Sequence, residues 1–156
     1  MREARSSGPN LLHAERAMSR QRRSWTEKLH SPRPHEVTTV DRPMPGWPAG
    51  TTMLIATPLI IDGYLREIPE GHAATTARMR DDLAKEYGTE TTCALTTGIF
   101  LRIASEAALE AMAAGAPRES VAPFWRMVER KSQLAKKLSC GPDEVARLRV
   151  AEGLTP

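Results

Sequence analysis

The stretch Val121-Ala122-Pro123-Phe124-Trp125-Arg126-Met127 decides how we interpret the rest of this 156-residue chain. Its run of apolar residues predicts a buried strand, which we expect to cover residues 121–129. The basic segment 130–133 would then form a turn, and residues 134–138 would return as a second short strand. Together these two strands would form a small β-wing.

Four helices are expected around this wing. Thr57 before Pro58 is a typical N-cap followed by a first helical residue, and Thr75-Thr76 and Thr96-Thr97 are similar starting points. The last helix should begin at Pro142, with acidic residues in its first turn, where the helix dipole favours them. Two helices joined by a short loop and followed by a hairpin form a winged helix-turn-helix. We therefore predict a mainly α (α+β) fold of this class.

The first fifty residues differ from the rest in charge and in proline content. Residues 1–50 hold nine basic and five acidic residues and carry +4, whereas residues 51–156 carry −1. We expect residues 1–50 to be a basic, proline-rich, disordered arm and linker, and residues 51–153 to be the folded domain. The arm is either a solvated tail or a segment that folds on nucleic acid. Within it, Trp25 and Leu29 predict a short helical segment that docks onto the domain.

The expected third helix, from about residue 96 to 114, has two different faces. Its buried face would consist of Ile99, Phe100, Ile103, Ala104, Ala107 and Ala111. The opposite face begins with Thr97, Gly98, Leu101, Arg102 and Ser105. Small residues let a helix backbone approach a partner closely. This end of the helix therefore either enters a nucleic-acid groove or packs tightly against a neighbouring helix.

Composition argues against several classes of protein. The longest apolar run covers residues 53–61, whereas a membrane-spanning helix needs about 20 residues, so we expect a soluble chain without membrane contact. Three of the four histidines lie in the expected arm, and no phosphate-binding glycine loop is visible. We therefore expect no metal site and no cofactor. The only cysteines, Cys93 and Cys140, form no disulfide framework, which favours the cytoplasm.

The remaining chemical signal is a set of basic residues. Its members are Arg102, Arg126, Arg130, Lys131, Lys136 and Lys137. Residues 118–149 hold eight basic and four acidic residues and carry +4. Such side chains neutralise phosphates and make binding strongly salt-dependent. They are also ordinary on the surface of a soluble protein, so this second interpretation stays open.

Three motifs resemble, in the same order, those of the alkylguanine-DNA alkyltransferases, also called methylated-DNA–protein-cysteine methyltransferases. The segment Ile68-Pro69-Glu70-Gly71 resembles the turn that opens their C-terminal DNA-binding domain. Pro123-Phe124-Trp125-Arg126-Met127 resembles their P-C-H-R-V active-site motif. Gly141, followed by Glu152-Gly153, resembles their glycine-rich turn and closing helix. The resemblance covers residues 57–153.

The resemblance implies a fold and a function. Members of that family bind duplex DNA through a winged helix-turn-helix, flip out a damaged guanine and transfer its alkyl group to the motif cysteine. Here Phe124 occupies the cysteine position, Trp125 the histidine position and Thr76 a tyrosine position. Alkyl transfer by that mechanism is therefore excluded. With an aromatic residue at the site, the chain resembles the alkyltransferase-like proteins that lack the cysteine.

The resemblance leads us to expect a non-catalytic protein that binds double-stranded DNA, including alkylated or flipped bases, and that works with DNA repair proteins as a monomer. The expected DNA-binding residues are Thr76, Thr97, Gly98, Arg102, Arg126, Arg130 and Lys131. The expected base pocket consists of Pro123, Phe124, Trp125 and Gly141, unless its aromatic rings simply fill the core. Two alternatives stay open. One is a fold-only descendant that acts as a protein-interaction module without DNA binding, and the other is an enzyme that uses Cys93 or Cys140.

Overall fold

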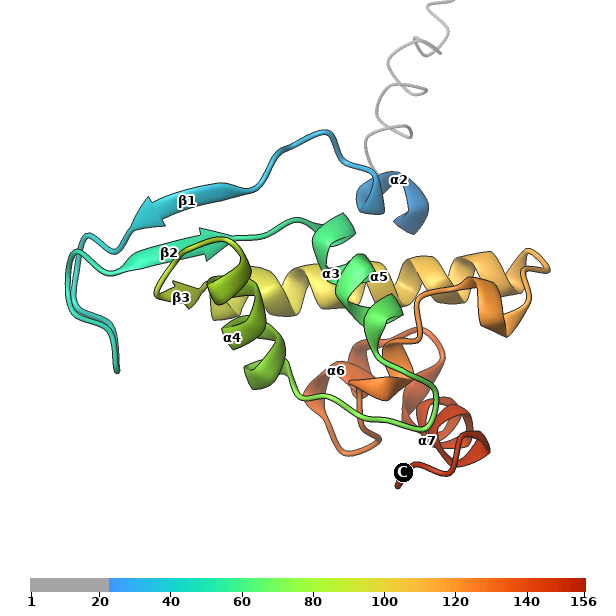
Figure 1. Ribbon diagram of the computed structural model, residues 1–156. Helices are drawn as coiled ribbons and strands as arrows, with labels where there is room; N and C mark the ends of the chain where they lie inside the picture. Colours follow the sequence, from blue (N-terminus) through green and yellow to red (C-terminus); the bar gives the residue numbers. More distant parts are fainter. Residues whose placement is uncertain (1–22) are drawn as a thin grey trace, which may run out of the picture.

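A computed structural model describes residues 23–156 of the chain. The fold is α+β and mainly helical, as expected (Figure 1). Its elements in chain order are α2 (Trp25–Leu29), β1 (Glu36–Thr39), β2 (Thr52–Ile55), α3 (Pro58–Glu67), α4 (Thr76–Glu86), β3 (Thr91–Thr92), α5 (Ala94–Ala113), η1 (Arg118–Ser120), η2 (Phe124–Arg126), α6 (Gln133–Lys137) and α7 (Gly141–Ala151). The part of the predicted arm at residues 1–22 lies outside the described residues.

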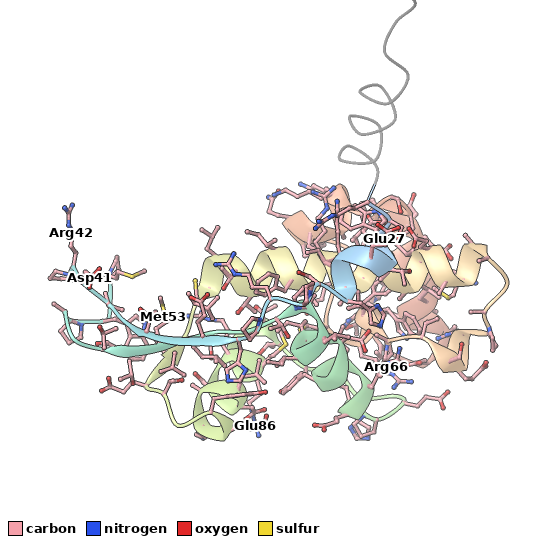
Figure 2. The ribbon with its side chains drawn as sticks, turned by 90° about the horizontal axis from the view of Figure 1, so that it is seen from above. Glu27, Asp41, Arg42, Met53, Arg66 and Glu86 are labelled. Atoms are coloured by element: carbon pink, nitrogen blue, oxygen red, sulfur yellow. The ribbon has the colours of Figure 1, made fainter. Side chains whose placement is uncertain are left out.

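Helix α5 is the longest helix of the fold, and α2, α3 and η2 pack against it (Figure 1). At one end of α5 lies a small sheet in the order β1-β2-β3, with β1 antiparallel and β3 parallel to β2. The hairpin formed by β1 and β2 extends past the helices, with Asp41 and Arg42 at its far end (Figure 2). Most of the core lies among the helices α3, α4, α5 and α7 and the 3-10 helix η2.

Two helix starts follow the capping signals in the sequence, whereas the predicted Thr96-Thr97 cap is wrong, because α5 begins at Ala94 without a side-chain cap. The side chain of Thr57 accepts a hydrogen bond from the Ile60 amide, and Pro58 is the first residue of α3. Thr75 caps α4 in the same way. Helix α7 begins at Gly141 with acidic residues in its first turn, as predicted. Local hydrogen bonding therefore explains where α3 and α4 begin, whereas the start of α7 rests on Pro142 and on the acidic residues of its first turn.

The predicted β-wing is wrong. Residues 124–126 form the 3-10 helix η2 instead of a strand, and residues 133–137 form helix α6. Pro123 has no amide hydrogen to donate to a strand ladder. Ser132 caps α6, because its hydroxyl accepts the Ala135 amide. The strands of this fold lie upstream, and the sequence analysis did not predict them.

The predicted buried face of α5 is confirmed only in part: Ala104 and Ala107 are buried, and Phe100, Ile103 and Ala111 are partly buried against the core. Thr97 and Leu101 are buried, whereas Ile99 is half exposed. The helix carries small or apolar residues on nearly every side, so their spacing did not fix its orientation. The buried hydroxyls of Thr97 and Ser105 donate to the carbonyls of Cys93 and Leu101, at 2.6 and 2.7 Å. These bonds satisfy both side chains inside the core.

The fold begins before residue 51, so the predicted boundary between arm and domain is not a boundary of the structure. Helix α2 packs on α5, and both lie together in the view from above (Figure 2). The backbone amides of Trp25 and Thr26 donate to the Glu110 carboxylate on α5. The docking of this short helix is therefore confirmed, and β1 completes the sheet. Within residues 23–156, no helix has the length and apolar character that crossing a membrane requires.

Helix α3 offers a matched test of where the core lies. Leu65 is fully buried, whereas Leu59 on the same helix is 44% exposed. We expect Leu65→Ala to lower the free energy of unfolding by roughly 2–5 kcal/mol, because it leaves a cavity. Leu59→Ala should change it by only about 0.5 kcal/mol. Urea titration followed by circular dichroism measures both values, and equal losses would contradict this packing.

Candidate functional site

The Glu152 carboxylate joins the three segments that carry the family-like motifs. It accepts hydrogen bonds from Nε and Nη2 of Arg126, at 2.9 and 2.8 Å. It also accepts the Gly71 amide at 3.4 Å, and Nη1 of Arg126 donates to the Ile68 carbonyl at 2.7 Å. The turn after α3, the helix η2 and the end of α7 therefore meet at one bidentate ion pair.

This ion pair is mostly removed from solvent. The side chains of Arg126 and Glu152 are 15% and 4% exposed. The hydrogen bonds from Arg126 lower the pKa of Glu152 to about 2, against the opposing effect of burial. Arg118 lies 3.4 Å from the same carboxylate, and its guanidinium stacks over the Trp125 ring at 5.0 Å. Because Glu152 neutralises it, Arg126 is not free to meet a DNA phosphate as predicted.

The two aromatic residues of the expected base pocket lie in the core. Phe124 is fully buried and Trp125 is 1% exposed, and their rings meet edge to face at 5.3 Å. Nη1 of Arg149 donates to the Trp125 carbonyl at 2.7 Å, which fixes η2 against α7. Neither ring presents a face on which a base could stack. The alternative that they fill the core describes this structure.

A cavity of about 380 Å³ lies beside the Glu152 ion pair. Pro123 and Trp125 line it, but so do charged residues of both signs, including Arg66, Arg118 and Glu119. The Trp125 indole nitrogen lies near the Glu152 carboxylate, but the geometry between them is not that of a hydrogen bond. Since its lining holds three basic and three acidic side chains, this cavity has no evident preference for an anionic ligand.

A second and larger hollow runs along the N-terminal half of α5, and we call it the α5 groove. It measures about 720 Å³ and is lined by α2, the start of α4, α5 and α6. Its most exposed apolar side chains are Leu95 and Ile99, at 74% and 50%. Gly98 and Arg102 complete a stripe on α5 at the spacing i, i+3, i+4 and i+7. Of the predicted DNA-binding residues, Thr76, Gly98 and Arg102 line this groove.

The lining of the α5 groove has one sign of charge. It includes Lys28, Arg102 and Lys137 and, within the described residues, no carboxylate. The first residues of two helices, Thr76 of α4 and Ala94 of α5, also line it. Helix N-termini carry a partial positive charge. The groove therefore combines an apolar floor with a positive potential.

Arg102 forms part of the groove wall. Its guanidinium lies 5.5 Å from the centre of the Trp25 ring, and Nη2 donates to the Lys137 carbonyl at 3.4 Å. Its Nε is buried without a hydrogen-bond partner. Lys28 approaches the same ring at 4.2 Å. Trp25 therefore positions two of the three cations of the groove.

The other predicted site residues do not gather at the α5 groove. Thr97 faces the core, and Gly141 begins α7 with a positive φ of 77°. Arg130 pairs with the exposed Asp143 at 3.0 Å, and Lys131 is exposed in the turn before α6. Sequence reasoning missed Leu95, Ile99 and Lys28. The spacing of Leu95, Ile99 and Arg102 was a usable signal, but the expected helix began too late to include Leu95.

The two cysteines have no arrangement that favours nucleophilic chemistry. Burial raises the pKa of the Cys140 thiol, with further contributions from Glu106 and Glu144, and this opposes thiolate formation. Cys93 precedes α5 and makes no capping hydrogen bond through its side chain. No group of three or more potential ligand side chains within residues 23–156 is placed to hold a metal ion.

No protein-family model, curated protein or solved structure matches the chain.

The Glu152 ion pair predicts a specific pH dependence of stability. Because its pKa is lowered from 4.5 to about 2 in the fold, the contribution of Glu152 is present above pH 4.5 and is lost as the pH falls toward 2. We expect Glu152→Gln to cost roughly 3 kcal/mol at pH 7. The difference in unfolding free energy from the wild type should shrink between pH 5 and pH 2.

Urea unfolding at several pH values measures this difference. The control is Glu144→Gln, because Glu144 pairs with Arg147 on the surface of α7. That change should cost about 1 kcal/mol or less. A cost of Glu152→Gln that stays constant from pH 7 to pH 2 would show that the carboxylate charge does not act as described.

Proposed function

We propose that this protein is a non-catalytic binder of double-stranded DNA, and that the α5 groove is its contact surface. The observation that carries the proposal is the combination of exposed Leu95 and Ile99 with three cations and two helix N-termini in a groove whose described lining contains no carboxylate. A role beside DNA repair proteins, suggested by the resemblance to the alkyltransferases, belongs to this proposal.

The shape and chemistry of the α5 groove suit the minor groove of DNA. Proteins that bind there place arginine and lysine near the phosphates and press apolar side chains against the base steps. Leu95 and Ile99 would supply the apolar contact, and Gly98 between them lets the helix backbone approach closely. Lys28 and Lys137 would meet the phosphate strands on either side. Helices α4 and α5, joined by residues 87–93, would act as a helix-turn-helix without the predicted wing.

The proposal does not include catalysis or a base pocket built from η2. Phe124 and Trp125 stand at the positions where the alkyltransferase motif carries its cysteine and histidine, and both are buried. The glutamate of the closing helix is bound by Arg126. These contacts support a non-catalytic protein that binds normal and alkylated duplexes with equal affinity.

A protein-interaction module is the second candidate, and one observation favours it. Leu95 and Ile99, at the spacing i and i+4, form an apolar strip beside Leu134. Grooves that bind the apolar face of an amphipathic helix have apolar strips of this kind. The basic rim would then select an acidic partner helix. The two candidates use the same surface and differ in the salt dependence and in the partner.

The test is a titration with short fluorescent duplexes at two salt concentrations. Three duplexes are compared: one plain, one with an alkylated guanine and one with a mismatch. We expect similar dissociation constants for all three, in the range of about 10⁻⁴–10⁻⁶ M at physiological salt, and much tighter binding at low salt. Lys137→Glu should weaken binding about tenfold and lower the salt slope by roughly 1.

Lys85→Glu is the matched control, because Lys85 is exposed on α4 outside the α5 groove. It should leave both affinity and salt slope close to those of the wild type. Undetectable binding at low salt, or equal effects of the two substitutions, would contradict the proposal. In that case binding of an acidic amphipathic peptide, lost in Leu95→Ser/Ile99→Ser, would establish the second candidate.

A further inference from the structure

A separate pocket of about 350 Å³ lies beneath the segment that connects α2 to β1. That segment arches over the connection from β2 to α3 (Figure 1). The floor of the pocket is apolar and comes from three elements: Ile55, Ala56, Pro58, Phe100 and Ile103. A concave, mostly apolar site of a few hundred Å³ is the usual form of a small-molecule site.

The rim of this α2–β1 pocket is basic. Arg23, Lys28 and Arg33 line it, and Glu36 is the one carboxylate among its described lining residues. Glu36 lies 3.4 Å from Arg33, so these two side chains neutralise each other at the exposed edge. Arg23 and Lys28 are left as excess positive charge above an apolar floor. Neither forms an ion pair with a described residue.

We propose that the α2–β1 pocket binds a small amphipathic carboxylate. Its apolar body would lie against Phe100 and Ile103, and its carboxylate would meet Arg23 and Lys28 at the rim. Both parts are needed, because the lining below the rim offers a charged head no cation and only the hydroxyls of Thr57 and Thr96, whereas the cations lie at the rim. This site does not depend on the proposed DNA function.

The pocket is linked to the α5 groove through two residues. Lys28 and Ile103 line both hollows, because α2 forms the wall between them. A carboxylate that takes up the Lys28 ammonium would leave less positive charge for a phosphate in the α5 groove. We infer that the ligand weakens DNA binding, and this second step rests on the proposed function.

The first experiment uses octanoate as the probe on the full chain, without DNA. Octanol has the same apolar body without the charge, and acetate has the charge without the body. Nuclear magnetic resonance titration should show octanoate binding about tenfold or more tightly than octanol, since a charge-assisted contact contributes on that scale. Acetate should cause no saturable shifts. The shifts should map to Ala56, Thr96 and Phe100.

Two variants test the location of the site. Lys28→Gln should remove most of the preference for octanoate over octanol, and Thr96→Phe, at the pocket lining, should block both ligands. Lys85→Gln is the control and should change neither. Wild-type circular dichroism spectra for all variants exclude misfolding as the cause. Equal binding of octanoate and octanol by the wild type, or octanoate shifts that survive Thr96→Phe, would overturn the proposal.

The link to DNA is measured separately. Saturating octanoate should weaken duplex binding several-fold in the wild type and have little effect in Lys28→Gln. Octanoate binding without any effect on DNA affinity would overturn the link and leave the ligand site intact. Octanoate binding by a chain that binds no DNA would overturn the proposed function alone.

Discussion

The ion pair between Arg126 and Glu152 holds together parts of the chain that are far apart in sequence. Arg126 reaches the carbonyl that ends α3, and Glu152 reaches the amide of the turn that leads to α4. A buried charge pair is stable only when its remaining donors and acceptors are also satisfied. Arg149 adds two further buried contacts from α7, one to the Trp125 carbonyl of η2 and one to the carbonyl of Val128 just after it. The position of η2, and with it the burial of Phe124 and Trp125, depends on this network.

Part of the surface of α5 stays exposed beside this network. Its N-terminal half exposes Leu95 and Ile99, whereas its middle is buried against α3 and η2. Buried Thr97 and Ser105 bond within the helix and need no partner from another element. The buried hydroxyls of α5 therefore place no constraint on which residues of the helix face solvent. Trp25 then fixes Lys28 and Arg102 at its edge.

Local signals in the sequence were sufficient for α3 and α4, because threonine caps, Pro58 and Gly88 act within one helical turn. For α7 the local signals were Pro142 and the acidic residues of the first turn. They were insufficient for η2 and α6. There an apolar run resembled a strand, and the deciding contacts come from Arg149 and from the Ser132 cap. The buried face of α5 was predicted only in part, since a helix with small or apolar residues on nearly every side gives no sharp face from its spacing alone. Of the candidate site, Thr76, Gly98 and Arg102 were found, but Leu95 and Ile99 required the structure.

Several contacts around Phe124 keep the region of Phe124 and Trp125 filled and inaccessible to a ligand. Phe124→Cys would place a small thiol in a volume that an aromatic ring now fills, and in a packed core this leaves a cavity. The thiol would still lie beside Trp125, which cannot act as a base, and Glu152 would still be held by Arg126. Each of these residues is fixed by bonds that also stabilise the fold. One substitution therefore cannot turn this part of the core into a pocket, which is why the exposed α5 groove is a better place to look for function than the surroundings of Phe124.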